Sequence, residues 1–428
     1  MAKAAADKPA IIPFTSYQKF VIFSMAVTMF TVVLDFMVMS PLGDMLMKSL
    51  TLEPSDFGFA VSAYAFSAGI SGLLTAGFAD KFDRKKLLLF FYSGFILGTI
   101  GCGLAHSYEF LLIARIVTGL FGGVIGSIAM AIITDLFLLN QRGRVMGFVQ
   151  MGFGASQVLG VPIGLFLANA WGWEAPFWMV AGLSLVIALM IFMRLKPVTD
   201  HLKVQQKTSP LKHLWGAVAK RDYRIGFTST ALLSIGGFMM MPFGSAFAIN
   251  NLGLTNEQLP MLFMVSGVCS LLAMPMVGRL SDRIDKFKIF MVASIWLMCV
   301  VVFYTHLGTT PLWLVLVFNV LMMMGIISRM IPSGALTSAI PDMADRGAFM
   351  SINSSLQQIA GGIAAAVAGV VVTQRGKGMP LEHYDKVGYI IVGISILSII
   401  LMARVSKLVK RKAAAMPAPA EAAVLMEA

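Results

Sequence analysis

Long apolar blocks dominate this chain and leave few choices for its fold. Of its 428 residues, 58% are hydrophobic and only 13% are charged, whereas soluble domains carry about 25% charged residues. The apolar residues gather in segments of the roughly 17–25 residues that a helix needs to cross a hydrocarbon core. These segments lack the strict alternation of a barrel strand. We therefore predict an all-α membrane protein, because helices satisfy their backbone hydrogen bonds internally.

The blocks predict twelve transmembrane helices, and the longest connection divides them into two bundles of six. We expect a retained first span rather than a cleaved signal peptide, because Asp35 interrupts the first block. The predicted spans are 20–43, 56–79, 87–105, 109–135, 145–169, 175–194, 224–250, 257–278, 289–306, 311–337, 348–373 and 387–405. The predicted units are a cytoplasmic N-terminus (1–19), a first bundle (20–194), a cytoplasmic linker (195–223), a second bundle (224–406) and a disordered cytoplasmic tail (407–428).

Lysine and arginine are distributed unevenly between the two sides of this predicted bundle. With both termini in the cytoplasm, the cytoplasmic segments hold most of the 33 basic residues. Because short cytoplasmic loops retain Lys and Arg, we predict cytoplasmic termini in a multi-pass protein of a bacterial inner membrane. The net charge of +12 needs no nucleic acid partner, since these loops face anionic lipid. The opposite loops hold only Lys48, Arg375, Lys377 and Lys386.

A dense charge cluster occurs twice along the chain. Residues 76–86 read AGFADKFDRKK and residues 278–288 read GRLSDRIDKFK, which places Asp80 and Asp282 202 residues apart. RGRVM at Arg142 and RGAFM at Arg346 lie 204 residues apart. Two unrelated matches at almost one offset indicate an internal duplication. Parallel repeats of six helices are a known architecture of secondary transporters.

The first cluster resembles the loop signature G-x-L-a-D-R-x-G-R-K-K of the major facilitator superfamily. It matches at Asp80 and at the later basic residues, and it departs at both glycine positions, which hold Ala76 and Asp83. RIVTGLFGG in the fourth span is similar to the R-x-x-x-G pattern of proton-linked members. The resemblance implies the twelve-helix fold of that superfamily.

The fifth span carries a second stretch that resembles this superfamily. GVPIGLFLANAWGWEAPF is similar to the G-V-P-x-G…G-W-R-x-x-F stretch of arabinose-efflux-permease-like and drug-efflux-like members, with Glu174 where those members usually have Arg. The motif residues of this span are Gly160, Pro162 and Gly164.

The resemblance also implies contacts between the two halves on the cytoplasmic side. Asp80 would accept hydrogen bonds from the helix start near Arg346, and Arg84 would pair with Asp135. The repeat implies a mirror pair, with Asp282 facing the helix start near Arg142 and Lys286 near Asp342. Alternating access needs contacts that form in one state only; in the alternative interpretation, the basic residues only fix topology. The predicted gate comprises Asp80, Lys81, Arg84, Asp135, Arg142, Asp282, Arg283, Lys286, Asp342 and Arg346.

Two opposite charges are expected at similar depth inside the membrane. Asp35 lies ~12 Å and Arg115 ~9 Å below the outer face, at 1.5 Å rise per residue. An isolated charge at this depth costs ~2.5–3.5 kcal/mol, so we predict that the two side chains pair. The resemblance to the major facilitator superfamily implies that both spans line a central cavity. Arg lowers the pKa of a nearby carboxyl and desolvation raises it, which gives the pair a physical basis for proton coupling. A static pair that only permits insertion is the alternative.

Further polar residues are candidates for the lining of a substrate cavity. Arg329, in the tenth span, has no acid at its level, so it either binds an anionic group of the substrate or snorkels to the inner interface. Hydrogen bonding between helices is the commoner use of the uncharged candidates. These are Gln150, Gln157, Asn319, Asn353 and Gln357.

The sequence contains no motif of an enzyme, a cofactor site or a metal site. Its three cysteines lie alone in separate apolar blocks, which argues against a thiolate metal site. We predict a monomeric secondary active transporter that exports a small organic solute, a drug, sugar or metabolite, in exchange for protons. A proton-coupled importer or uniporter of the same fold is an alternative. From another class, a membrane receptor or a lipid scramblase is also considered.

Overall fold

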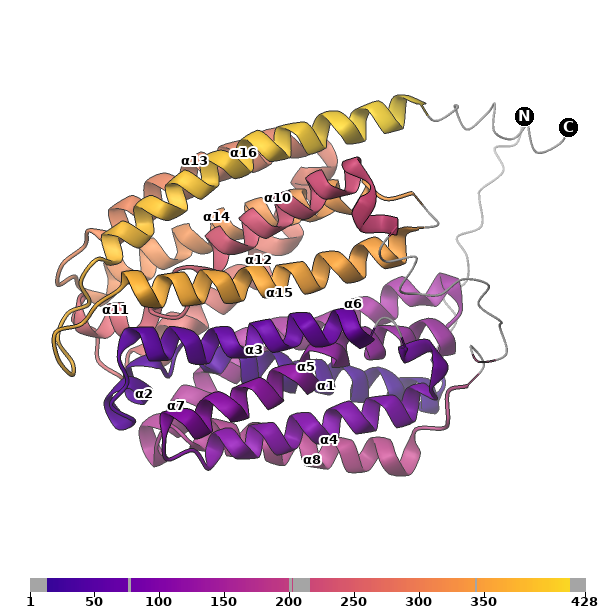
Figure 1. Cartoon of the computed structure of the whole chain (residues 1–428), viewed down its shortest axis with the longest axis horizontal. Helices are drawn as coiled ribbons and strands as arrows, with labels where there is room; N and C mark the ends of the chain where they lie inside the picture. Colours follow the sequence, from indigo (N-terminus) through magenta and orange to yellow (C-terminus); the bar gives the residue numbers. More distant parts are fainter. Residues whose placement is uncertain (1–13, 76–77, 200–201, 203–215, 343–344, 416–428) are drawn as a thin grey trace, which may run out of the picture.

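The computed structural model describes residues 14–75, 78–199, 202, 216–342 and 345–415. Over these residues the chain is helical, apart from one isolated antiparallel bridge between Thr373 and Glu382. The long helices run roughly along one direction and form two groups, drawn in indigo to pink and in red to yellow (Figure 1).

The first group contains two interrupted helices and four continuous long ones. Its elements are α1 (Ser16–Val38), α2 (Gly43–Ser49), α3 (Pro54–Thr75), the 3₁₀ turn η1 (Ala79–Lys81), α4 (Arg84–Gly103), α5 (Tyr108–Leu136), α6 (Leu139–Ala155), the π-helical segment η2 (Ser156–Gly160), α7 (Val161–Trp171) and α8 (Ala175–Arg194). The interrupted helices are α1–α2 and α6–η2–α7.

The second group repeats much of this order. Its elements are α10 (Arg221–Phe238), α11 (Gly244–Asn250), α12 (Leu259–Arg283), α13 (Lys286–Thr305), α14 (Leu312–Ser338), α15 (Arg346–Val371) and α16 (Tyr384–Ala415). We call the end of the molecule where α1 begins and α16 ends the terminal end. The opposite end, which carries α2 and α11, is the distal end (Figure 1).

Eleven described helical stretches are long and apolar enough to cross a membrane, which agrees with the predicted all-helical membrane fold. One of them, Arg144–Trp171, combines α6, η2 and α7. The predicted seventh span is not among the eleven, because the 18 residues of α10 include Arg221, Asp222 and Arg224. Even so, α10 packs against α15 and α16, and α11 follows it as α2 follows α1.

In each charge cluster an aspartate stands at the second glycine position of the loop signature, and this aspartate caps the helix that follows. Asp83 Oδ1 accepts hydrogen bonds from the backbone N–H groups of Lys85 at 2.9 Å and Val198 at 3.0 Å. It therefore caps α4 and fastens the chain that follows α8. Asp285 caps α13 in the same manner, accepting from the N–H of Phe287 at 2.9 Å. An N-cap aspartate typically contributes about 1 kcal/mol to helix stability.

The last helix extends further than the sequence indicated. α16 continues to Ala415, so the prediction of a disordered tail is wrong for residues 407–415, and residues 416–428 lie outside the described part. Its basic end contacts acids of the second group: Lys410 Nζ lies 2.6 Å from Asp285 and Lys412 Nζ 2.9 Å from Asp342. These pairs attach the end of α16 to the connections before α13 and α15.

Small residues bring the two groups together. A Cβ atom added to Gly58 of α3 would lie 2.8 Å from the Ala365 carbonyl oxygen and 2.9 Å from the Cα of Gly369, both in α15. On the other side of the molecule, a Cβ on Gly267 of α12 would lie 2.8 Å from Val158 of η2. Glycine allows such close approach of helix backbones in a membrane, where packing rather than hydrophobic burial holds helices together.

Candidate functional site

A buried ion pair lies at the centre of the first group. Arg115 Nη1 of α5 donates to Asp35 Oδ2 of α1 at 2.8 Å, and both side chains are fully buried. Thr99 Oγ1 of α4 donates to the other carboxylate oxygen at 3.2 Å. The predicted pairing of Asp35 with Arg115 is therefore present. Residues of α1, α4 and α5 form the pair and its hydrogen bonds, so the geometry of the pair depends on how these three helices pack.

Aromatic rings connect this ion pair to the second group. The guanidinium carbon of Arg115 lies 4.6 Å from the ring centre of Tyr64 in α3. The Tyr64 ring contacts Phe36 with centroids 5.3 Å apart, and Phe36 contacts Phe238 of α10 at 6.1 Å. A desolvated cation–π contact contributes about 2 kcal/mol. The rings thus form a continuous path from Arg115 to the interface between the two groups.

A small cavity lies beside the end of this path. Its walls come from α1 and α3 on one side and from α10, α15 and the chain after α10 on the other. They are apolar and aromatic except for one amide, Gln358. The lining residues are Phe36, Val61, Ala65, Phe238, Met241, Pro242, Gln358, Gly361 and Ala365.

The fifth-span motif supports α1 on either side of Asp35. A Cβ on Gly160 would lie 2.8 Å from Leu34, and one on Gly164 would lie 3.1 Å from Val38. Pro162 lacks the N–H that would continue the regular helix ladder, and the π-helical turn η2 ends two residues before it. The motif therefore sets how closely η2 and α7 approach the helix that carries the buried acid.

The distal end is closed by polar contacts between the two groups. Ser40 donates from its hydroxyl to the Met241 carbonyl, and Ser245 Oγ donates to the Ser40 carbonyl at 2.6 Å. Asn250 Nδ2 donates to Asp44 Oδ1 at 2.7 Å. The Phe57 and Phe243 rings meet at 5.8 Å. Further hydrogen bonds between the two groups at this end run from Asn169 Nδ2 to the Asn256 carbonyl at 3.0 Å and from Lys377 Nζ to Thr51 Oγ1 at 2.9 Å.

At the terminal end, one half of the predicted gate is present within the first group. Arg84 Nε lies 3.4 Å from Asp135 Oδ2, as predicted. Arg142 instead donates to the carbonyls of Phe137 at 3.0 Å and Thr134 at 2.5 Å, which caps the end of α5. Lys81 is exposed, and the side chain of Asp80 lies outside the described residues.

The mirror half of the gate differs from the prediction. Lys286 Nζ donates to the Ser281 carbonyl at 3.1 Å rather than to Asp342, whose partners are Lys412 and Tyr223. The predicted Lys286–Asp342 pair is wrong here because the extension of α16 brings Lys412 to that acid. The side chains of Asp282, Arg283 and Arg346 are exposed, so none of them closes the interface in this conformation.

The charged groups of the terminal end titrate as ion-paired groups. The hydrogen bond from Lys412 lowers the pKa of Asp342, and that from Lys410 lowers the pKa of Asp285. The hydrogen bond to Asp345 raises the pKa of Lys220. Each shift favours the charged form, so these contacts persist near neutral pH.

Arg329 occupies a place that the sequence did not indicate. It is 3% exposed and lies inside the second group, where Nη1 donates to Ser395 Oγ of α16 at 3.2 Å. Its guanidinium carbon is 5.5 Å from the ring centre of Phe290 in α13. Nε and Nη2 have no hydrogen-bond partner among the described residues. The predicted positions of Arg329, in a substrate cavity or at the inner membrane–water interface, are therefore wrong in this conformation, because this face of α14 turns towards α13 and α16.

The other polar candidates are dispersed. Asn319 accepts a hydrogen bond from the Ser266 hydroxyl and thus joins α14 to α12. Gln150 and Gln357 are exposed, whereas Gln157 and Asn353 are half-buried. None of the five lines the cavity between the groups; the interior amide there is Gln358, the neighbour of Gln357.

Sequence reasoning missed the aromatic path and Thr99. The cavity residues were predicted from polar side chains. The aromatic path consists of Phe36, Tyr64 and Phe238, which carry no charge. The helical spacing of Gln357 and Gln358 leaves open which of the two amides faces the first group, since adjacent residues differ by about 100° in direction.

Two packed helical groups, a charge pair buried in one and an interface closed at one end define a multi-pass membrane protein built like secondary transporters. The chain belongs to the Major Facilitator Superfamily, whose family model matches residues 25–365 and 226–425.

Relatives from bacteria carry transporter names. The uncharacterized MFS-type transporter YbcL of Bacillus subtilis is 25% identical over 382 residues, which cover 89% of this chain and 95% of that protein. YceJ of the same organism, also an uncharacterized MFS-type transporter, is 26% identical over 61% of this chain and 66% of its own. A probable sugar efflux transporter of Helicobacter pylori (strain G27) is 24% identical over 66% of this chain and 72% of that protein.

Solved structures of low sequence identity share the fold. A D-xylose–proton symporter superimposes with a TM-score of 0.74 at 16% identity, covering 90% of this chain and 97% of its own. A bacterial homologue of the human lysosomal transporter Spinster, in an inward-facing and occupied conformation, gives 0.68 at 14% identity, covering 95% of this chain and all of the other.

Proposed function

We propose that this protein exports a small organic solute by alternating access and that the Asp35–Arg115 pair couples export to proton entry. The observation that carries the proposal is the ion pair itself: both side chains are fully buried, and rings link Arg115 to the interface between the two groups. Ionisable residues within membrane spans mark proton relays and substrate pathways. We further propose twelve spans, with α10 and α11 as the seventh, a monomeric state, and the terminal end in the cytoplasm of an inner membrane.

The proposed coupling follows from the position of the aromatic path. Opening the distal end separates the groups and removes the contact between Phe36 and Phe238 that closes the cavity. The Tyr64 ring and Arg115 are then free to shift, and a shift of Arg115 removes the charge that stabilises the Asp35 carboxylate. Loss of that charge favours protonation of Asp35. Reformation of the pair in the distal-closed state expels the proton towards the terminal end.

The walls of the cavity suit a solute with an apolar face, once separation of the two groups widens the cavity from its present volume of about 10 Å³, which holds about one water molecule. Phe36 and Phe238 offer ring surfaces, and the Gln358 amide offers N–H donors and an acceptor oxygen. Sugars carry several hydroxyl groups, but their apolar faces stack on aromatic rings, and the names of the Helicobacter relatives make sugars the first class to test. Hydrophobic drugs fit the apolar walls, and they form the second class.

Transport in proteoliposomes tests both parts of the proposal. A panel of sugars, nucleosides and cationic drugs is presented under an imposed pH gradient of either sign. We expect wild-type protein to move one class against its gradient only when protons flow the other way. Asp35→Asn retains exchange of labelled for unlabelled solute but loses gradient-driven accumulation. If Asp35→Asn keeps full pH-driven transport, the coupling role is wrong; if solute and protons move together, the direction of export is wrong.

A further inference from the structure

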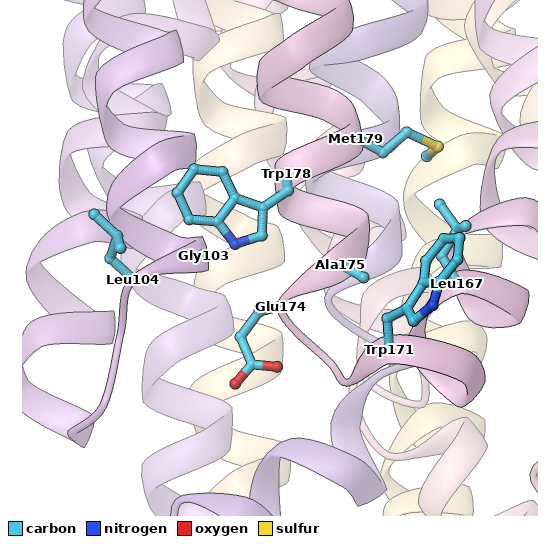
Figure 2. A pocket seen from close by; sticks show the side chains of 8 residues that line it. All are labelled: Gly103, Leu104, Leu167, Trp171, Glu174, Ala175, Trp178 and Met179. Carbon is cyan, nitrogen blue, oxygen red and sulfur yellow. The ribbon is translucent and has the colours of Figure 1, made fainter.

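A groove separate from the central cavity opens at the distal end of the first group. It encloses about 620 Å³ between the distal ends of α4, α7 and α8 (Figure 2). Its walls are apolar and aromatic, with a single charged side chain. The lining residues are Gly103, Leu104, Leu167, Trp171, Glu174, Ala175, Trp178 and Met179.

The charged side chain of this groove is an acid without a basic partner. Glu174 lines the groove together with the two tryptophans (Figure 2), and no basic residue is among the lining residues. In the described part of the chain, no Lys, Arg or His forms an ion pair with Glu174. A carboxylate at a membrane surface with apolar neighbours attracts a cation, because part of its hydration is replaced by hydrocarbon.

A tight turn fixes the position of this acid. Gly172 ends α7 with φ of +98°, a value that only glycine adopts without strain. Its N–H donates to the Ala168 carbonyl at 3.0 Å, and the Ala175 N–H donates to its carbonyl at 3.1 Å. Glu174 immediately precedes α8. The backbone that carries Glu174 is therefore fixed by hydrogen bonds at the end of the groove rather than placed on a loose loop.

The two tryptophans complete a site for an ammonium group. Trp171 is 74% and Trp178 44% exposed, and both line the groove with Glu174 (Figure 2). Indole faces bind cations more strongly than other aromatic rings. Each indole N–H group donates a hydrogen bond and accepts none, which suits it to phosphate oxygens. The Trp178 indole lies against Gly103, where a Cβ would be 3.1 Å from Nε1.

We propose that this groove binds a phospholipid with a primary amine in its headgroup, of the phosphatidylethanolamine class. The ammonium lies on Glu174, beside the indole surfaces that line the same groove, and the phosphate accepts from an indole N–H. One acyl chain follows Leu104 and Leu167, which are apolar and lie where the groove meets the membrane-facing surface of α4 and α7. The inference does not depend on which solute the protein transports.

The charge of Glu174 distinguishes the proposed lipid site from an ordinary belt of interfacial tryptophans. Tryptophans gather at membrane interfaces without any specific partner, but such a belt has no use for a carboxylate. Glu174 repels the anionic headgroup of phosphatidylglycerol and attracts the ammonium of phosphatidylethanolamine. Preference between these two lipids therefore depends on Glu174 if the groove is a binding site, and is independent of it if the tryptophans act as a belt.

Native mass spectrometry of the full chain with each of these two lipids tests the proposal. We expect wild-type protein to retain phosphatidylethanolamine in preference to phosphatidylglycerol, and Glu174→Gln to bind phosphatidylethanolamine about tenfold more weakly, as expected for loss of one charge contact of ~1.4 kcal/mol. Glu53→Gln, which neutralises another exposed acid near the distal end, is the matched control and keeps wild-type binding.

A second variant keeps the test informative if the first affects folding. Trp171→Leu retains the carboxylate and an apolar side chain but removes one indole, and it weakens phosphatidylethanolamine binding without changing the monodispersity of the purified protein. Equal binding of the two lipids by wild-type protein overturns the proposal. So does wild-type lipid preference in Glu174→Gln, or an equal loss in Glu53→Gln.

Discussion

The two halves of the molecule each bury an arginine, and they do so in opposite ways. Arg115 of the first half pairs with Asp35 at 2.8 Å and has Tyr64 against its guanidinium. Arg329 of the second half has a serine hydroxyl and a phenylalanine ring, but no acid among the described residues. Asp285 and Asp342 of the second half meet basic residues at the exposed terminal end instead.

This difference shows that the fold is duplicated but the surroundings of the buried charges are not. The repeated charge clusters each begin a helix with an N-cap aspartate, Asp83 in one half and Asp285 in the other. Among the described residues, a buried ion pair occurs in the first half only, where Tyr64 and Phe36 link it to Phe238 of the second half.

Removing Arg115 is expected to produce the largest effect. Arg115→Gln leaves the Asp35 carboxylate buried without its counter-charge, which costs about 3–5 kcal/mol of stability. Thermal unfolding in detergent measures the loss. The double variant Asp35→Asn/Arg115→Gln recovers part of it, because no charge then remains in the site. Equal stability of the single variant and wild type would remove the distinction between the two arginines.

Removing Arg329 is expected to act in the opposite direction. Arg329→Met replaces a buried guanidinium that has two unpartnered nitrogens with an apolar side chain of similar length. Relief of unsatisfied buried donors stabilises a protein by about 1–3 kcal/mol. The same unfolding measurement shows a higher midpoint for Arg329→Met. Arg115 also has two guanidinium nitrogens without a hydrogen-bond partner among the described residues, but its Nη1 pairs with Asp35. A loss for Arg329→Met as large as that of Arg115→Gln would therefore mean that Arg329 also neutralises a buried acid.

The aromatic contact of Arg115 sharpens the comparison further. Tyr64→Leu removes the ring against the guanidinium and lowers stability by about 2 kcal/mol, the value of a desolvated cation–π contact. Tyr64→Phe keeps the ring and serves as the control. If both variants lose the same stability, the hydroxyl rather than the ring face supports the pair.

The exposed pairs of the second half are expected to contribute least. Lys410→Gln removes the partner of Asp285 and costs less than about 1 kcal/mol near neutral pH, as for other surface ion pairs. The lowered pKa of Asp285 means that its contribution is present above the ordinary carboxyl pKa and disappears as pH falls through the lowered value. Unfolding at neutral pH and near pH 3 measures this decline. Lys407→Gln, an exposed change on the same helix, shows no such pH dependence.

Depth along a helix was predictable from sequence, but direction around the helix was not. Counting residues placed Asp35 and Arg115 at similar depth, and the structure joins them. The same counting gave a depth for Arg329 without indicating that it faces α13 and α16. The predicted Lys286–Asp342 pair failed for a related reason: the repeat suggested the geometry, but Lys412 reaches the acid from a helix whose length the sequence pattern did not reveal.

The sequence by itself determined the membrane-spanning helices, the twofold repeat and the need for a partner at each buried charge. These follow from the cost of placing polar groups in hydrocarbon, which depends on composition and length. Only the tertiary structure decided which partners meet: the ring path from Arg115 to Phe238, the closure of the distal end and the groove around Glu174. Those depend on the rotation and close approach of helices, which glycines at a few contacts set and which no single helix encodes.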